Sequence, residues 1–473
     1  MTELLRGRKM KRYDDESFPG ELSPEAVQNQ VERILGSEKF ARSKRLRSLL
    51  RFTVQQTLQG HADTLKEYVI GTEVLKKPDS YDPRRDSLVR VLASRLRVKL
   101  KEYYNNGGSD DPLVIEFPKG KYVPRFQRRE QLQTEIEKKL RSRNACSQGK
   151  FLLTRLSEPT LAEAAQHFDE AVEADPSWPG AHEGAALVHA FQAFLGLHKP
   201  RETWPQARTQ AEAALQLDEM SADAHLVLGM VSAYYEWRWR DAESHIQRAI
   251  ERDSFSGAGH LWRALACLLP FSKISEAQEE LAKARDLAAA PLLEEGYSLG
   301  LYFSERYEEI LKQDERQWPT APMPSLMSSI RACALAETGR ANEAIELLQH
   351  SYDETPSRTR SAASLAYLYG ITGQPDRSRD ILANLQSRRE HGEWISNYQI
   401  AVAYAGLGQS NEALAAIQDA VRDREPWVVY LHIDPRFRPL REVPKFAGFA
   451  RRVLMTETEL ATAEQATEVS EKV

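Results

Sequence analysis

The feature that most constrains this chain of 473 residues is a helical motif that returns about every 34 residues. The full copies have a small residue, a bulkier residue four positions later and a small residue three after that, as in Ala164-Phe168-Ala171; the copy at 207 has Ala211 in the middle, and those at 310 and 378 are weaker. The copies begin at 164, 207, 242, 277, 310, 344, 378 and 413. One such triplet occurs in many helices, but eight in near-constant phase indicate a tandem array of helical units.

The residue types explain the spacing. Antiparallel helices pack closely only where a small residue lets their backbones approach, and the bulkier residue fills the space toward the next copy. The pattern resembles the tetratricopeptide repeat (TPR), which implies an α-solenoid of helix pairs over 150–453. We expect Trp427–Arg452 to cap the last copy, 454–473 to be a flexible tail, and the concave groove to bind a partner protein or peptide or to mediate a homodimer.

The sequence before 150 has a different character. Residues 1–126 carry 25 Lys and Arg against 18 Asp and Glu, a net charge of +7, whereas the whole chain has −5. Any polyanionic partner is therefore expected to meet this basic segment. A solvated basic surface would give the same modest surplus.

Start and stop signals divide the basic segment into elements. Ser23 and Pro24 are an N-cap and a first helical residue, and apolar periodicity predicts further helices at 43–60, 64–76 and 87–104. Alternating patterns predict two strands around a turn at Pro118–Lys121. We assign three segments on this basis: a disordered basic arm at 1–22, a domain of helices plus a small β-hairpin at 23–128, and a charged helical linker at 129–149.

Cations gather on one side of the helix expected at 87–104. Its apolar residues form a stripe of about 100°. The opposite side collects Arg90, Ser94, Arg97 and Lys101, with Arg95 on the flank. Lys and Arg neutralise DNA phosphates, and Arg can pair bidentately with guanine. An ordinary amphipathic helix with a solvated face has the same pattern.

The predicted hairpin is basic as well. Gly120 supplies its turn, Lys119 and Lys121 flank that glycine at the tip, and Arg125 lies on the second strand. Pro124 has no N–H, so this strand is expected at an edge. A basic hairpin tip of this kind can reach the sugar-phosphate backbone of DNA.

Helix and hairpin together resemble the winged helix-turn-helix of OmpR-type and CadC-like bacterial regulators. Ser94–Leu100 (SRLRVKL) is similar to the recognition-helix core of that family, and Phe117–Tyr122 (FPKGKY) is similar to its wing, with Lys119 and Lys121 at the two family glycines. The resemblance covers 43–126. Before residue 43 the sequence differs from the family, because the family has a small sheet there and this chain has a predicted helix. The resemblance implies double-stranded DNA as partner and a set of contact residues: Arg90, Ser94, Arg95, Arg97, Lys101, Lys119, Lys121 and Arg125.

No motif indicates an enzyme, a metal or a cofactor. Gly120-Lys121 and Gly149-Lys150 lack the earlier glycine of a phosphate-binding loop, and Cys146, Cys267 and Cys333 lie too far apart for a zinc site. No apolar run approaches the ~20 residues of a membrane span, and the basic start leads into no apolar stretch. We expect a cytoplasmic protein that makes no membrane contact.

The sequence therefore predicts a mainly α protein, with an N-terminal winged helix followed by an α-solenoid of TPR-type helix pairs. The function predicted from it is DNA-binding transcriptional regulation without enzymatic activity. Two alternatives remain: a non-enzymatic TPR scaffold whose N-terminal domain does not bind DNA, and a component of a signalling or cyclase-type system with an inherited domain of this kind.

Overall fold

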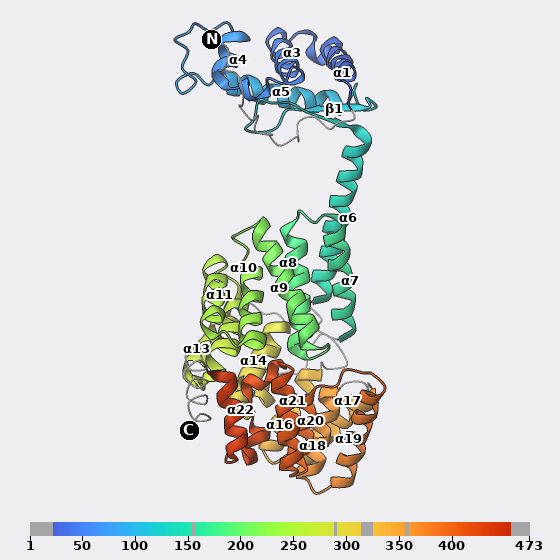
Figure 1. Ribbon diagram of the computed structural model, residues 1–473, viewed down its shortest axis with the longest axis vertical. Helices are drawn as coiled ribbons and strands as arrows, with labels where there is room; N and C mark the ends of the chain where they lie inside the picture. Colours follow the sequence, from blue (N-terminus) through green and yellow to red (C-terminus); the bar gives the residue numbers. More distant parts are fainter. Residues whose placement is uncertain (1–21, 154–157, 288–290, 314–324, 355–358, 456–473) are drawn as a thin grey trace, which may run out of the picture. The chain divides into compact units, whose positions relative to one another are not determined.

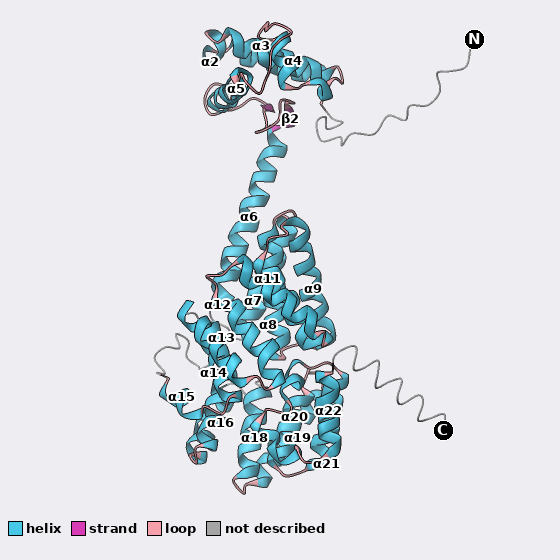
Figure 2. Cartoon of the chain, turned by 90° about the vertical axis from the view of Figure 1, so that its left-hand side faces the viewer, coloured by secondary structure: helices cyan, strands magenta, loops and turns pink. Residues whose placement is uncertain are grey.

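Helices make up most of the computed structural model (Figure 1), which describes residues 22–153, 158–287, 291–313, 325–354 and 359–455. The chain forms two compact units, Met1–Lys138 and Lys139–Val473, which we call the head and the body. The expected arm (1–22) and tail (454–473) fall almost wholly outside the described residues. Figure 2 shows strands in the head and helices throughout the described body.

The head encloses one apolar core between five helices and a hairpin. Its helices are α1 (Pro24–Gly36), α2 (Glu38–Ala41), α3 (Lys44–Leu58), α4 (Glu67–Glu73) and α5 (Leu88–Tyr104). The Ser23 hydroxyl accepts a hydrogen bond from the N–H of Ala26, which confirms the predicted cap. Phe40, Leu49 and Leu96 are fully buried where these helices meet.

The hairpin pairs β1 (Leu113–Glu116) with β2 (Arg125–Arg128) in antiparallel register, Glu116 opposite Arg125. The expected tight turn is therefore wrong: the second strand begins three residues late, after an eight-residue loop, 117–124. Phe117 and Pro124 are buried at the two ends of this loop, which keeps them out of the ladder. Gly120 has φ +80°, so it supplies a turn as predicted.

The head begins with a helix, as the cap at Ser23 and Pro24 predicts, and not with a sheet. Among the described residues the head contains one sheet of two strands, and α1 packs against β1. The Nε2 of Gln30 on α1 donates to Asp111 (2.5 Å), just before β1. The head is therefore a set of helices with a two-stranded hairpin, and the predicted winged helix is not shown.

The body is a TPR-like helical solenoid, as predicted, and its described helices form eight consecutive pairs. These are α6 (Arg129–Leu153) with α7 (Glu158–Ala174), α8 (Pro179–Leu195) with α9 (Pro200–Leu217), α10 (Ala222–Val231) with α11 (Trp239–Arg252), α12 (Gly257–Trp262) with α13 (Ile274–Leu287), α14 (Pro291–Phe303) with α15 (Tyr307–Lys312), α16 (Ser325–Glu337) with α17 (Ala341–Glu354), α18 (Thr359–Ile371) with α19 (Pro375–Glu390), and α20 (Asn397–Gly406) with α21 (Ser410–Arg422). The first residue of every motif copy lies on the second helix of its pair and is fully buried. The expected linker ends early, because Ser142, Cys146 and Gly149 of α6 are buried in the first pair.

In six of the eight pairs, the turn contains a residue with positive φ five positions before the motif. Glycine supplies it at Gly339, Gly373 and Gly408. Three other copies use a residue with a side chain: Trp237 (φ +59°), Ser272 (φ +56°) and Glu305 (φ +56°). A side chain in this region costs about 1 kcal/mol relative to glycine, so these turns are strained.

The segment after the last pair packs on that pair and also extends to earlier ones. Residues 426–443, including η7 (Pro426–Tyr430) and η8 (Pro435–Leu440), pack against the first helices of several pairs. The Trp427 Nε1–H donates to Phe194 O (2.9 Å), and the Tyr430 hydroxyl donates to Leu265 O (2.9 Å). Residues 426–443 therefore fill the groove that was expected to receive a partner, with Trp427 and Tyr430 buried against the first helices.

The last helix, α22 (Pro444–Leu454), packs on α21 and also returns to the third pair. The Trp239 Nε1–H at the start of α11 donates to Val453 O (3.3 Å). Residues more than 200 positions apart are thus neighbours within the body.

We predict that Gly406→Ala destabilises the body. A Cβ at Gly406 would lie 2.5 Å from the backbone of Tyr367, so α18 and α20 would have to separate. Overpacking of this kind lowers the free energy of unfolding by about 1–3 kcal/mol, which denaturant unfolding measures. Gly448→Ala in α22 is the control, because nothing lies within 4 Å of its Cβ position and the helix should keep or gain stability.

Candidate nucleic-acid interface

Helix α5 presents a narrow exposed face between two covered sides. Its predicted apolar stripe is confirmed, since Val89, Leu92, Leu96 and Leu100 are buried in the head core. The exposed residues are Arg90, Val91 (41% exposed), Ser94, Arg95, Val98 (55% exposed) and Lys101. Val91 and Val98 leave two small apolar surfaces on this face.

A cleft of about 520 Å³ runs between this face and the start of α3, and we call it the α5 cleft. Its lining residues are Arg42, Ser43, Lys44, Arg45, Leu46, Leu75, Leu88, Val91, Leu92, Ser94, Arg95, Val98 and Lys99. Five of these residues are cationic and none is acidic. The cleft therefore offers positive charge, short polar groups and small apolar surfaces to one ligand.

The cation central to this face is Arg95. Within the described residues it forms no hydrogen bond or ion pair, and neither does Arg45 at the start of α3. Lys99 is partly neutralised, because its Nζ lies 2.7 Å from a carboxylate oxygen of Glu102. Arg95 and Arg45 are thus the cations best placed to contact a bound polyanion.

The expectation that Arg97 projects outward is wrong. Its Nε donates to Phe117 O (2.9 Å), and an Nη donates to Pro118 O (2.8 Å) and Lys121 O (3.1 Å). The guanidinium also lies 5.5 Å from the centre of the Phe117 ring. Arg97 therefore holds the hairpin loop against α5, a contact that a helix projection cannot show because its acceptors are backbone carbonyls.

Arg90 is also engaged within the head. It donates to Pro83 O (2.9 Å) in the turn before α5, and its Nε lies 3.3 Å from a carboxylate oxygen of Glu67 on α4. Arg90 and Arg97 flank the side of α5 covered by the hairpin loop, so the free face is rotated away from the predicted one.

We predict that Arg97→Ala loosens the hairpin loop and destabilises the head. Each lost hydrogen bond from a charged donor contributes about 1.5–3 kcal/mol, and the part-buried carbonyls would lose their partner. Hydrogen exchange of the loop amides should rise, and the thermal transition of the head should fall. Lys101→Ala is the control: Lys101 is exposed, so unchanged exchange is expected there. Equal behaviour of the two variants would contradict the role of Arg97.

The other predicted contact residues lie either in the α5 cleft or on the exposed surface outside it. Ser94 and Arg95 line the α5 cleft, whereas Lys101 is exposed beside it. Lys119 and Lys121 are exposed on the loop, and Arg125 is exposed on β2. Arg42, Lys44 and Arg45, which lie just before and at the start of α3, also line the cleft. Their position at a predicted helix start was the signal that could have identified them.

Tyrosines at the end of α5 fix the hairpin. The Tyr104 hydroxyl accepts from the N–H of Ile115 in β1 (2.8 Å), and the Tyr103 hydroxyl donates to Asp111 (2.6 Å). Burial, followed by the bond to Asp111, raises the pKa of Tyr103 to about 12. Both phenols stay protonated at neutral pH, so these bonds persist under the conditions in which a ligand would bind.

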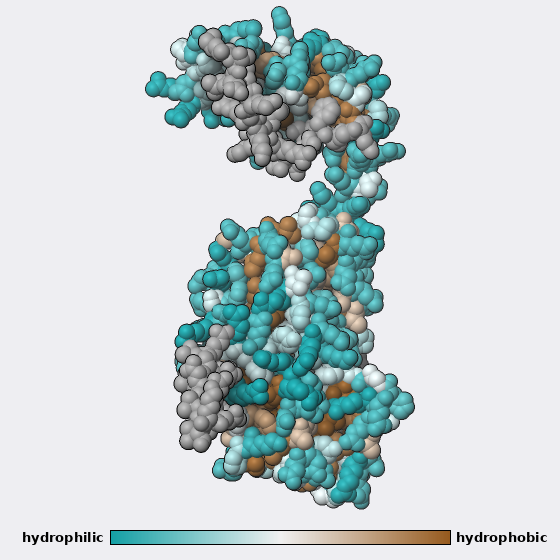
Figure 3. Space-filling model, in the orientation of Figure 1, coloured by the Kyte–Doolittle hydropathy of each residue, from teal (hydrophilic) through white to brown (hydrophobic). Residues whose placement is uncertain are grey.

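Two further searches bear on the kind of site. Among the described residues, no helix is long and apolar enough to cross a membrane. The same residues contain no group of three His, Cys, Asp or Glu side chains that could hold a metal ion. Figure 3 shows a mainly hydrophilic surface with small, separate apolar areas.

Comparisons with known proteins add little to this geometry. No protein-family model and no curated protein matches the chain. Among solved structures, a human IFIT1 dimer with m7Gppp-AAAA is 14% identical, over 98% of this chain and 96% of that one, with a TM-score of 0.36. Yeast Tom70 is 13% identical over 89% of each chain, with a TM-score of 0.37. A tetratricopeptide repeat protein from Parabacteroides merdae is 11% identical, over 64% of this chain and 98% of that one, with a TM-score of 0.27. Likeness this distant carries no argument about function, and the helix pairs described above define the class.

Proposed function

We propose that the protein is a non-enzymatic helical-repeat scaffold whose head binds double-stranded DNA through the α5 cleft. The interaction scaffold follows from the class of the body. DNA binding depends on one observation in the head: Arg95 and Ser94 stand exposed on a helix beside three cations of α3, and the cleft has no acidic lining residue.

In this proposal α5 enters the major groove. Arg95 pairs with a guanine edge, and the methyl groups of Val91 and Val98 contact thymine methyl groups. Arg42, Lys44 and Arg45 bind phosphates at the N-terminus of α3, where the unpaired backbone N–H groups also favour anions. Lys119 and Lys121 add contacts to the sugar-phosphate backbone. Arg97 acts indirectly, because it positions the loop that carries these two lysines.

A scaffold whose head does not bind DNA is the second candidate. The exposed Val91 and Val98 favour it, because apolar side chains beside a basic cleft also suit an acidic protein partner. In either case the partner of the body meets a surface other than the groove filled by residues 426–443.

The salt dependence of binding distinguishes the two candidates. Affinity of the full chain for a random pool of short duplexes, measured by fluorescence anisotropy between about 50 and 200 mM salt, should fall linearly in a log–log plot. Arg45→Ala should lower the magnitude of that slope by about 1. The matched control is Arg33→Ala on α1, since Arg33 does not line the cleft and should leave the slope unchanged. Absence of binding at the lowest salt would favour the scaffold candidate.

A further inference from the structure

A second basic cleft lies in the body, where the last helices return to the early pairs. Its volume is about 820 Å³, within the range of small-molecule sites. We call it the arginine cleft, and its lining residues are Arg201, Tyr235, Glu236, Trp237, Arg238, Gln418, Val421, Arg422, Arg424, Phe449 and Arg452.

Hydrogen bonds between distant segments hold this cleft in place. An Nη of Arg424 donates to the carbonyl oxygens of Tyr235 (3.2 Å) and Glu236 (3.3 Å), and Arg201 donates to Arg422 O (3.0 Å). These bonds join the second and third helix pairs to the end of the last pair. The walls are therefore preorganised, which reduces the entropy that a ligand would otherwise lose on binding.

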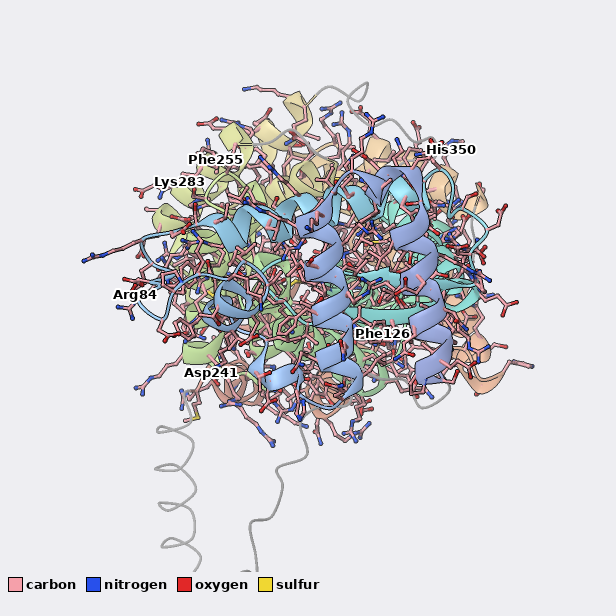
Figure 4. The ribbon with its side chains drawn as sticks, turned by 90° about the horizontal axis from the view of Figure 1, so that it is seen from above. Arg84, Phe126, Asp241, Phe255, Lys283 and His350 are labelled. Atoms are coloured by element: carbon pink, nitrogen blue, oxygen red, sulfur yellow. The ribbon has the colours of Figure 1, made fainter. Side chains whose placement is uncertain are left out.

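All five cations of the cleft are arginines, and three of them have carboxylate partners. Arg238 pairs with Asp241 (2.6 Å), which is labelled in Figure 4, and Arg422 pairs with Asp419 (2.7 Å). Arg201 lies 3.9 Å from Asp423. These pairs leave part of the positive charge of the cleft without compensation.

Arg424 and Arg452 carry that uncompensated charge, since neither pairs with a carboxylate of a described residue. Burial lowers the pKa of Arg424, and the charges of Arg452 and Arg201 lower it further despite the opposing effect of Glu236. The acidic lining residue Glu236 is itself held by Arg208 (2.6 Å). An anion would relieve the repulsion among these arginines.

The backbone beside the cleft is strained at two facing residues. Trp237 and Arg424 have φ of +59° and +57°, and the Arg424 guanidinium lies 3.9 Å from the centre of the Trp237 ring. The position of Trp237 is glycine in three other turns, and its side chain here places an aromatic ring against an arginine. A π-helical turn, Ser232–Glu236, precedes it, a feature that is frequent at functional sites.

We propose that the arginine cleft binds a small ligand that carries phosphate groups. Arginine forks form paired hydrogen bonds with phosphate oxygens, and the exclusive use of arginine over lysine suits this geometry. The site is separate from the α5 cleft, so this inference stands whether or not the head binds DNA.

Calorimetric titration of the full chain with tripolyphosphate tests the proposal, with sulfate at equal ionic strength as reference. Tripolyphosphate should bind the unmodified chain more tightly than sulfate does. Arg452→Ala should weaken its binding about tenfold, because a charge-assisted contact is lost. Arg451→Ala is the matched control: Arg451 is the exposed neighbour on α22, does not line the cleft, and should leave affinity unchanged.

Three results would overturn the proposal. The first is no binding of tripolyphosphate, and the second is equal weakening by both variants, which would indicate attraction by general surface charge. The third is a phosphorylated peptide that binds more tightly than tripolyphosphate and loses affinity in Arg452→Ala, which would assign the cleft to a protein partner. Retained DNA binding alongside any of these results would leave the function proposed for the head intact.

Discussion

Replacing Asp434 by Asn is expected to lower the free energy of unfolding of the body by about 3–5 kcal/mol. Asp434 and Arg436 form an ion pair at 2.6 Å with side chains 0% and 5% exposed. The substitution keeps the shape of the side chain but leaves the guanidinium of Arg436 buried without a counter-charge. The hydroxyls of Tyr302 (3.1 Å) and Tyr398 (2.7 Å), which donate to the same carboxylate, would also lose a charged acceptor.

The same carboxylate should make the body sensitive to acid. Burial alone would raise the pKa of Asp434, but the Arg436 charge and the hydrogen bonds outweigh it and hold the pKa below its ordinary value. The group therefore contributes stability that is fully present above about pH 4 and is lost as the pH falls through the lower folded-state pKa. In Asp434→Asn this part of the acid dependence should disappear.

Urea unfolding at neutral and acidic pH, followed by circular dichroism, measures both effects. Asp376→Asn is the matched control, because Asp376 is 92% exposed and pairs with Arg379 on the surface of α19. A surface pair contributes about 0–1 kcal/mol, so the control should remain close to the unmodified chain. Similar loss in the two variants would contradict the buried pair.

Trp427→Ala should destabilise the body by a comparable amount, about 3–5 kcal/mol. The indole is 4% exposed, donates to Phe194 O, and lies 4.0 Å from the guanidinium of Arg360. Its removal opens a cavity and exposes Arg360 to an empty space. Arg360 is already poorly neutralised in its buried site: burial, together with the charge of Arg436, lowers its pKa to about 9.

Thermal or urea unfolding of the full chain checks this prediction. Phe255→Ala provides the comparison, since Phe255 is an aromatic residue of the same body that is 83% exposed (Figure 4). Its removal should change stability by less than about 0.5 kcal/mol. If Trp427→Ala were equally mild, residues 426–443 would not be filling the groove.

The sequence predicts the repeat array well because its signal is local. Ala164 and Ala413 are each fully buried on the second helix of their pair, so a period of about 34 residues is enough to find them. The occupied groove could not be predicted in this way. Trp427 and Phe194 are 233 positions apart, and nothing in either local pattern indicates the other.

In the head, too, local patterns predict some features and miss contacts between distant residues. The buried stripe of α5 follows from periodicity, but the hairpin loop covers a second side through bonds from Arg97 to backbone carbonyls. Such acceptors have no side-chain signature. The sequence therefore placed Arg97 on the free face, whereas the structure leaves that role to Arg95 and adds the cations of α3.

Selection of bound sequences from random duplex DNA with the full chain tests the central claim most directly. The unmodified chain should enrich a defined sequence, and Arg95→Ala should relax the preference at one base pair, a discrimination of about 1–3 kcal/mol. Arg33→Ala should enrich the same sequence as the unmodified chain. A pool that stays random with the unmodified chain, or an Arg95→Ala variant that enriches an unchanged sequence, would contradict DNA reading by the α5 cleft.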